Sequence, residues 1–449
     1  AILAAMSDPK NVDIDSDDEE VVVMPTSKEP EIVEDTTLAN PDVVTKYQEA
    51  AKIVQAALVE ISAKCIAGAK IADICKFGDE LLAQRTNAIY KNKNKAGKVV
   101  LRGVAFPVCI SINECVCHCS PLESDTEYPA LAADDMVKID LGAHIDGYIV
   151  LAAHTLIVGV DLSTVEAAAV VQSGRRAAVI NAAYTAAEVA AKLIKNGNTN
   201  SAVTAAIKQV AEMYDVRPIS GTLMHQMKQY VIDGKKMILL KELEPDQQKV
   251  EACTFETGEV YAIDIAMSTG DGKPRDMGMR TTVYKRQVEQ KYALKNKASR
   301  DFFNEVNKKS PTLPFSLRSM DDEKAARMGV RECVTHGLMA SYPVLYERKG
   351  DFVAHVKFTV LLMPNGTLQV CGLPPVTFSA MCKTGAASAE GVSLMNGNIG
   401  RLLFAQHKAE HPEAVIPEAI DAVLNEVKAE SKKKAKKAAK AAAVAGVSA

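Results

Sequence analysis

The sequence predicts a mixed α/β (α+β) fold in which a helix followed by a hairpin is used twice. An alanine-rich helical stretch, Lys46 to Gly68, precedes two apolar runs between Ala133 and Val158 that an Asp-Gly turn separates. A second alanine-rich stretch, Arg176 to Gly197, precedes another apolar run, Val260 to Ala266. This repetition predicts a domain with internal pseudo-two-fold symmetry.

One aspartate occupies the same place in each repeat. Asp140 and Asp264 both follow an isoleucine in the middle of a predicted strand. A buried carboxylate without a partner is costly, so each needs a metal ion, a cation or several hydrogen-bond donors. The symmetry of the repeat places both side chains in one central cleft.

The other elements follow from apolar spacing and turn residues. Residues 1–40 are acidic and contain proline without a periodic apolar pattern, so we expect a disordered acidic tail. Helices are expected at Asp42 to Cys65 and at Ile71 to Arg85, before an extended stretch from Gly103 to Cys117. The rest is predicted as helices at Val165 to Lys195, Ser201 to Tyr214 and Glu418 to Val427, strands within Asp351 to Val370, and a hairpin turn at Ser268 to Lys273.

The composition excludes some classes of protein. At 449 residues and 48% hydrophobic, the chain can bury a large core. It lacks an apolar run of the roughly 18 residues that a membrane helix needs, so we expect no membrane insertion. Ten cysteines lie in core-like segments and no signal peptide opens the chain, so we expect reduced thiols in the cytosol or nucleus.

Five motifs carry a resemblance to a known family. The sequence resembles the creatinase/methionine-aminopeptidase superfamily, and within it the proliferation-associated, ErbB-receptor-binding proteins, which are non-peptidase relatives of type-2 methionine aminopeptidase. The resemblance covers roughly residues 43–372. Its motifs are Val116-Cys-His118, Val137-Lys-Ile-Asp-Leu-Gly142, His225-Gln-Met-Lys-Gln-Tyr-Val-Ile-Asp-Gly234, Gly278-Met-Arg-Thr-Thr-Val-Tyr-Lys285 and Phe358-Thr-Val-Leu-Leu-Met-Pro-Asn-Gly366.

The resemblance implies the "pita-bread" fold with a helical subdomain inserted between two of its strands. We therefore expect the main domain over residues 41–300 and 350–410, with the insert over residues 301–349. Residues 411–449 are expected to form a terminal helix and a lysine-rich tail.

The family's metal site can be tested position by position. A two-metal aminopeptidase needs about five ligands, mostly bridging carboxylates and one imidazole. Asp140, His225 and Asp264 match three of these positions, whereas the second aspartate position holds Leu151 and the last glutamate position holds Lys357. His118 matches the family's pocket histidine, which contacts substrate; a core histidine is the alternative.

Lys357 favours a site without metal or other cofactor. An ammonium group in the cleft repels a divalent ion, and it offsets the mutual repulsion of Asp140 and Asp264 as a buried ion pair. The predicted result is a vestigial pocket formed by His118, Asp140, Leu151, His225, Asp264 and Lys357. A residual one-metal site on Asp140, His225 and Asp264 is the alternative.

The run Glu114 to Cys119 invites a zinc interpretation. Strand geometry places Cys115, Cys117 and Cys119 on one face and His118 on the other, so four ligands do not converge on one ion. A structural zinc site is therefore not expected.

Three basic stretches are candidates for contact with nucleic acid. Clustered lysines and arginines neutralise phosphates and give salt-dependent binding with little sequence preference. Each stretch is also compatible with an ordinary solvated surface, and the tail with a nuclear-targeting signal. The candidates are Lys91, Lys93, Lys95 and Lys98 in one loop, Lys285, Arg286, Lys291, Lys295, Lys297 and Arg300 before the insert, and Lys432, Lys433, Lys434, Lys436 and Lys437 in the tail.

The resemblance gives these stretches a partner. It implies binding to RNA and to the large ribosomal subunit near the peptide exit tunnel, with roles in ribosome biogenesis, translation and transcriptional control, in the cytoplasm, nucleus and nucleolus. The alternative is a nuclear and cytoplasmic protein-interaction adaptor whose tail only directs localisation. A residual methionine aminopeptidase is a minor alternative.

Overall fold

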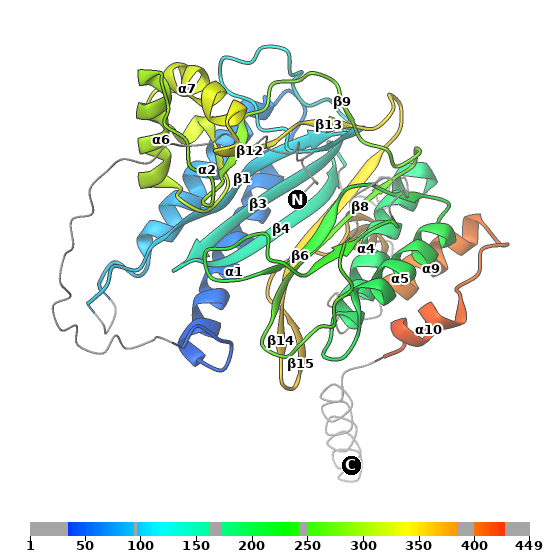
Figure 1. Ribbon diagram of the computed structural model, residues 1–449. Coiled ribbons are helices and arrows are strands. Elements are labelled where there is room, and N and C mark those ends of the chain that lie inside the picture. The colour runs from blue at the N-terminus through cyan, green and yellow to red at the C-terminus, as the bar shows by residue number, and fades with distance from the viewer. Residues whose placement is uncertain (1–34, 94–96, 161–172, 243–249, 384–398, 427–449) are drawn as a thin grey trace, which may run out of the picture.

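The computed structural model describes residues 35–93, 97–160, 173–242, 250–383 and 399–426 (Figure 1). Most of the predicted acidic tail, Lys95 of the basic loop and the lysine-rich tail lie outside these residues. Within the described ranges, no helix is long and apolar enough to span a membrane.

A nine-stranded antiparallel sheet forms the centre of the molecule. Its main strands follow the order β1-β3-β4-β14-β8-β6-β7, with β15 paired to β14 and β5 paired to β8. The bounds are β1 Arg102–Ile112, β3 Met136–Ile145, β4 Tyr148–Ile157, β5 Arg217–Pro218, β6 Leu223–Met227, β7 Met237–Leu239, β8 Val260–Ser268, β14 Val353–Met363 and β15 Gly366–Gln369.

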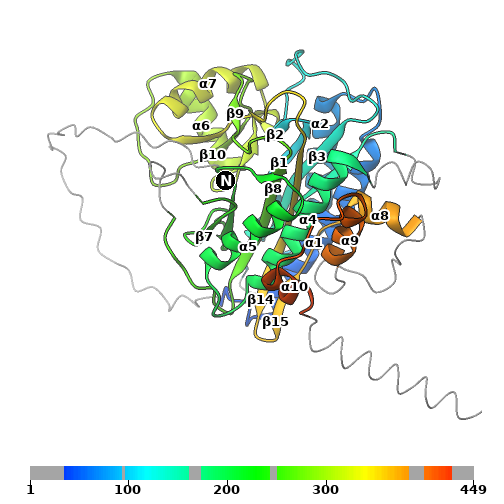
Figure 2. The ribbon, with the colours of Figure 1, turned by 90° about the vertical axis from the view of Figure 1, so that its right-hand side faces the viewer.

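Helices cover one face of this sheet in two matching sets. Helices α1 (Pro41–Lys64) and α2 (Ile71–Ala88) pack on β1, β3 and β4, and α4 (Gly174–Leu193) packs on β8 and β14 with α5 (Asn200–Met213) beside it. The insert lies on the other side of the sheet (Figure 2). The two sets of helix and paired strands confirm the predicted repeat and the pita-bread architecture.

Local sequence signals explain where these elements begin and turn. The side chain of Asn40 accepts a hydrogen bond from the backbone N–H of Asp42, and Pro41 fills the first turn, so α1 starts there. Between β3 and β4 the chain turns at Asp146 and Gly147, both with positive φ. The alanines of α4 are almost all buried, and such small side chains let the helix lie close to the sheet.

The insert differs from its predicted bounds. Helix α6 (Lys297–Lys309) starts before residue 301, and the insert also contains β11 (Phe315–Ser316), the 3₁₀ helix η1 (Leu317–Ser319) and α7 (Glu323–Thr335). Strand β12 (Met339–Tyr342) then pairs with β10 (Val283–Arg286), so the subdomain recruits residues from before position 300. Phe302, Val306, Phe315, Val330 and Cys333 belong to a hydrophobic core separate from that of the main domain.

Three other parts of the fold differ from the predictions. The loop at Ser268 to Lys273 is not a hairpin turn, because β9 (Arg275–Asp276) pairs with β13 (Leu345–Tyr346) and not with β8. Helices α8 (Val376–Lys383) and α9 (Ile399–Glu410) were not predicted. The last helix, α10 (Glu418–Leu424), ends earlier than expected.

Candidate functional site

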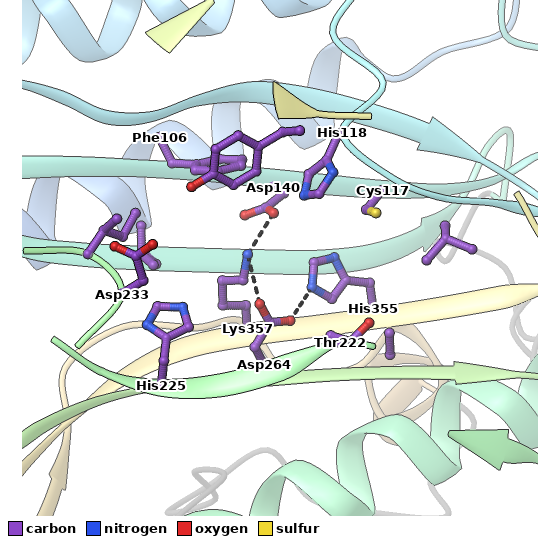
Figure 3. A pocket seen from close by; sticks show the side chains of 15 residues that line it. Phe106, Cys117, His118, Asp140, Thr222, His225, Asp233, Asp264, His355 and Lys357 are labelled. Carbon is purple, nitrogen blue, oxygen red and sulfur yellow. Dashed lines mark hydrogen bonds and ion pairs between the residues drawn. The ribbon is translucent and has the colours of Figure 1, made fainter. Parts of the chain in front are cut away.

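All six residues of the predicted vestigial pocket line one cavity (Figure 3). It lies on the sheet face opposite the helices, under β12 of the insert and β2 (Cys115–Cys117). Its volume is about 30 Å³, which is room for a water molecule. The sequence therefore identified a real convergence of side chains, although the space that they leave is very small.

The strand register places the charged residues in one row. Asp140 on β3 lies opposite Ala153 on β4, Ala153 lies opposite Lys357 on β14, and Lys357 lies opposite Asp264 on β8. Neighbouring strands are about 4.8 Å apart, so Asp140 is two strands away from Lys357. A lysine side chain spans this gap because alanine, the smallest side chain available with a Cβ, stands between them.

The Lys357 ammonium group joins the two aspartates. Its Nζ lies 2.7 Å from Oδ2 of Asp140 and 3.1 Å from Oδ2 of Asp264. All three side chains are at least nine-tenths buried. Lys357 Nζ also lies 5.3 Å from the centre of the Phe106 ring, which adds a cation–π contact. This geometry agrees with the ion pair predicted from the sequence.

Charge in this row controls protonation. Burial alone would lower the pKa of Lys357, but the carboxylates of Asp140 and Asp264 outweigh it and raise that pKa above its usual value. Burial would likewise raise the pKa of Asp264, yet the positive Lys357 and the hydrogen bond from His355 hold it well below its usual range. The row is therefore a charged cluster at neutral pH.

His355 completes the cluster and was missed by the sequence analysis. Its Nε2 lies 2.7 Å from Oδ1 of Asp264, so it donates a hydrogen bond to the second oxygen of that carboxylate. His355 precedes Lys357 by two residues on β14, and side chains two apart on a strand share a face. That alternation was the available signal, but the partner of His355, Asp264, lies on another strand, β8.

Two further histidines are buried and neutral. Burial lowers the pKa of His118 and of His225 to about 3. Nδ1 of His118 lies 3.0 Å from the carbonyl oxygen of Pro343, so the ring donates its proton there. Nδ1 of His225 and Oδ1 of Asp140 have no hydrogen-bond partner, and a single water in the cavity could serve such atoms.

Apolar side chains line much of the rest of the cavity. Phe106, Leu151, Ile232 and Tyr342 all line the cavity and are more than nine-tenths buried. Leu151 also packs so tightly against β3 that a Cβ at Gly142 would come within 2.4 Å of its Cδ2. Leu151 is therefore a packing residue at the position where the metal site needs a carboxylate.

Comparison with known proteins gives the chain a family. Residues 45–293 match metallopeptidase family M24. The chain belongs to family M24.

Individual relatives narrow the assignment within the family. The chain is 49% identical to ErbB-3 binding protein 1 of Solanum tuberosum, in a match that covers 74% of this chain and 82% of that protein. It is 43% identical to proliferation-associated protein A of Dictyostelium discoideum, over 76% of this chain and 85% of the relative. It is 38% identical to the curved DNA-binding protein of Schizosaccharomyces pombe, over 76% of this chain and 86% of that protein. These relatives place the chain in the proliferation-associated, ErbB-binding group of M24.

A solved structure supports the same fold. The structure of a thermophilic Arx1 superimposes with a TM-score of 0.72 at 27% sequence identity, covering 87% of this chain and 99% of that one. The same fold therefore accounts for most of the chain.

The residues present do not fit the metal ions of an M24 peptidase. Both carboxylates of the row already accept hydrogen bonds from Lys357, and Asp264 accepts a second from His355. Within the described ranges, groups of three or more His, Cys, Asp and Glu side chains arranged to hold a metal are absent. This geometry does not favour the alternative of a one-metal site on Asp140, His225 and Asp264, because the Lys357 ammonium group lies between its two carboxylates.

The cysteine run also differs from its expected geometry. β2 ends at Cys117, and His118 takes a positive φ of 63°, so the alternation of faces stops there. Cys117 and His118 consequently line the same cavity, whereas Cys115 and Cys119 hydrogen-bond to each other away from it. The free thiols are Cys65, Cys75, Cys109, Cys115, Cys117, Cys119, Cys253, Cys333 and Cys371.

The candidate phosphate-binding cations divide into two classes. Lys285 pairs with Asp233 beside the cavity, and Arg286 stacks on Phe303 of the insert, so both hold the insert in place. The others within the described ranges are exposed and remain candidates for a binding surface, namely Lys91, Lys93, Lys98, Lys291, Lys295, Lys297 and Arg300.

Replacing Lys357 by methionine tests the role of the ammonium group. Lys357→Met leaves two buried carboxylates without a counter-charge, so we expect the free energy of unfolding at pH 7 to fall by about 3–5 kcal/mol. Asp264, whose pKa is depressed in the native protein, stabilises the fold at neutral pH. In the variant the pKa of Asp264 rises, so the carboxyl takes up a proton as pH falls. The loss in free energy of unfolding relative to the native protein therefore shrinks between pH 7 and pH 4. Urea unfolding at several pH values measures both effects.

The control adds Asp140→Asn and Asp264→Asn to Lys357→Met. This neutral variant removes the unpaired charges and should regain most of the lost stability at pH 7. If Lys357→Met alone unfolds like the native protein at every pH, the ammonium group is not what neutralises the row.

Proposed function

We propose that this M24 protein is not a peptidase, and that it binds RNA and ribosomes through the surface outside the old metal site. The observation that carries the first part is the Lys357 ammonium group lying 2.7 Å and 3.1 Å from the two aspartates that would bind metal. Aminopeptidase chemistry needs a water activated by divalent ions and a place for the substrate amine and carbonyl. A lysine at this point supplies neither.

The shape of the cavity supports the same proposal. A volume of about 30 Å³ accommodates one water and has no room for a methionine side chain. Phe106 and Tyr342 pack edge to face with 5.7 Å between ring centres, which closes the side toward the insert. Opening this space requires rearrangement of packed aromatic side chains.

The second part of the proposal rests on exposed cations. Lys291 and Lys295 lie in the segment before α6, Lys297 and Arg300 lie in its first turn, and Lys91, Lys93 and Lys98 lie in the loop before β1. Such groups release counterions from a phosphate backbone, which gives binding that weakens with salt. The partner that the family resemblance implies is the large ribosomal subunit near the exit tunnel, and the role is in ribosome biogenesis and translation. The proposed location is the cytoplasm and nucleus, including the nucleolus.

Names of relatives support both nucleic-acid and protein partners. The Schizosaccharomyces pombe relative is named for DNA binding, and the Solanum tuberosum relative for binding ErbB-3. The second name favours the alternative function, a protein-interaction adaptor and transcriptional co-regulator. The two functions separate after nuclease treatment, since an adaptor keeps its protein partner and loses ribosomal subunits.

Restoring two ligands tests the loss of metal chemistry. The double variant Leu151→Asp with Lys357→Glu rebuilds the missing carboxylates, so we expect it to gain Mn²⁺ or Co²⁺ binding that calorimetry can detect. Neither single variant should bind metal. Leu151→Asp alone leaves the Lys357 ammonium group in the site, and Lys357→Glu alone leaves too few ligands. Release of methionine from a Met-Ala-Ser peptide by the native chain with added metal would contradict the proposal.

Co-sedimentation with large ribosomal subunits tests the binding function. We expect the intact chain to pellet with subunits at physiological salt and to dissociate as salt rises. A chain that ends at Val427 lacks the lysine tail and should show a shallower dependence on salt, because each lost phosphate contact lowers that slope by roughly 0.7 to 0.9. If the intact chain fails to pellet even at low salt, the adaptor function takes first place.

A further inference from the structure

A pair of stacked aromatic rings lies in the middle of the exposed cations of the insert. Tyr292 and His336 have ring centres 3.6 Å apart with planes inclined by 11°. Both are exposed to solvent, Tyr292 with 36% of its surface. Neither belongs to the insert's hydrophobic core, so packing of that core does not account for them.

Backbone contacts fix this pair in place. His336 is the C-cap of α7, and the segment before α6 crosses the end of that helix. The backbone N–H groups of Lys295 and Asn296 donate to the Glu332 side chain at 2.7 Å and 3.1 Å, and the N–H of Gln287 donates to Leu338 O at 2.8 Å. The Tyr292 ring is therefore held on the surface rather than on a loose loop.

The charge around the rings favours an anionic ligand. Lys291 adjoins Tyr292 in the chain, and Lys295, Lys297 and Arg300 follow within eight residues, all exposed. Glu289 and Asp301 are the acidic residues between positions 288 and 301, and Glu332 reaches the same segment, where its carboxylate already accepts hydrogen bonds from the backbone of Lys295 and Asn296. Four cations therefore face three carboxylates. Together, Tyr292, His336, Lys291, Lys295 and Lys297 form what we call the basic-aromatic platform.

We propose that the basic-aromatic platform binds unpaired RNA, with a nucleobase stacked on the Tyr292–His336 pair and the neighbouring phosphates on the lysines. Aromatic side chains bind bases through their π-faces with little sequence preference, and lysines bind the backbone. A base inside a duplex has no free face, so the ligand is a single strand, a loop or a bulge. This inference rests on the proposed RNA-binding function and names the class of RNA that it takes.

Stacking and charge have different signatures in a binding experiment. The full chain is titrated with a labelled single-stranded oligouridylate and with an RNA duplex of the same length, over a range of salt. We expect Tyr292→Leu to weaken single-strand binding by roughly 5- to 150-fold with an unchanged salt slope. Tyr292→Phe keeps the ring and should bind like the native protein.

Charge variants give the complementary result. Lys291→Gln with Lys295→Gln should reduce the salt slope by about 1.4, because each single-strand phosphate contact contributes about 0.7. Tyr292 is exposed and lies outside the core, so its variants should keep the native urea midpoint, which is measured alongside.

Three results would overturn the inference. If the Tyr292→Leu variant binds single-stranded RNA as tightly as the native protein, no base stacks on the rings. The proposed RNA binding then does not depend on them. An equal loss for single strand and duplex excludes recognition of an unpaired base. Failure of the native chain to bind either RNA at low salt overturns the RNA-binding function as well, and a protein partner is then the occupant to seek.

Discussion

One ion-pair cluster determines the character of the central cleft. The Lys357 ammonium group lies between Asp140 and Asp264, the two aspartates that the family resemblance assigns to a metal site. Two buried carboxylates without a counter-charge destabilise the folded protein. A site of this kind without metal is therefore stable only if the aspartates are replaced or a cation lies between them. This chain keeps the aspartates and places the cation. The hydrogen bond from His355 completes the neutralisation of Asp264.

The rest of the site follows from the strand register. The row from β3 across β4 and β14 to β8 brings Lys357 beside Asp264 and within reach of Asp140 over the small side chain of Ala153. With the charges satisfied inside the row, the space above it can fill with Leu151, Phe106 and Tyr342. The result is a closed, packed pocket on a scaffold whose outer surfaces remain available for partners. Lys285, which pairs with Asp233 beside the pocket, ties the insert to this closed state.

Sequence reasoning predicted the parts of the fold that strong local patterns encode. The hairpin with Asp140 and the strand with Asp264 were predictable because apolar alternation and an Asp-Gly turn mark them, and Lys357 was predictable from the family motif beside it. His355 was missed because its role depends on a neighbour in another strand. The start of the insert was misplaced because β10 joins it through pairing with β12, a contact distant in sequence. Likewise, the positive φ of His118 places Cys117 in the cavity against the expected alternation.

The metal content of the intact chain tests most directly whether an ammonium group has replaced the ions of this M24 site. The protein is purified with Mn²⁺, Co²⁺ or Zn²⁺ present throughout, exchanged into volatile buffer and weighed by native mass spectrometry. The predicted result is the mass of the chain alone, because the brief exchange into volatile buffer removes any ion that is bound only weakly. One or two ions retained per chain in stoichiometric amount would contradict the central claim, because Lys357 could not then lie where it neutralises both aspartates.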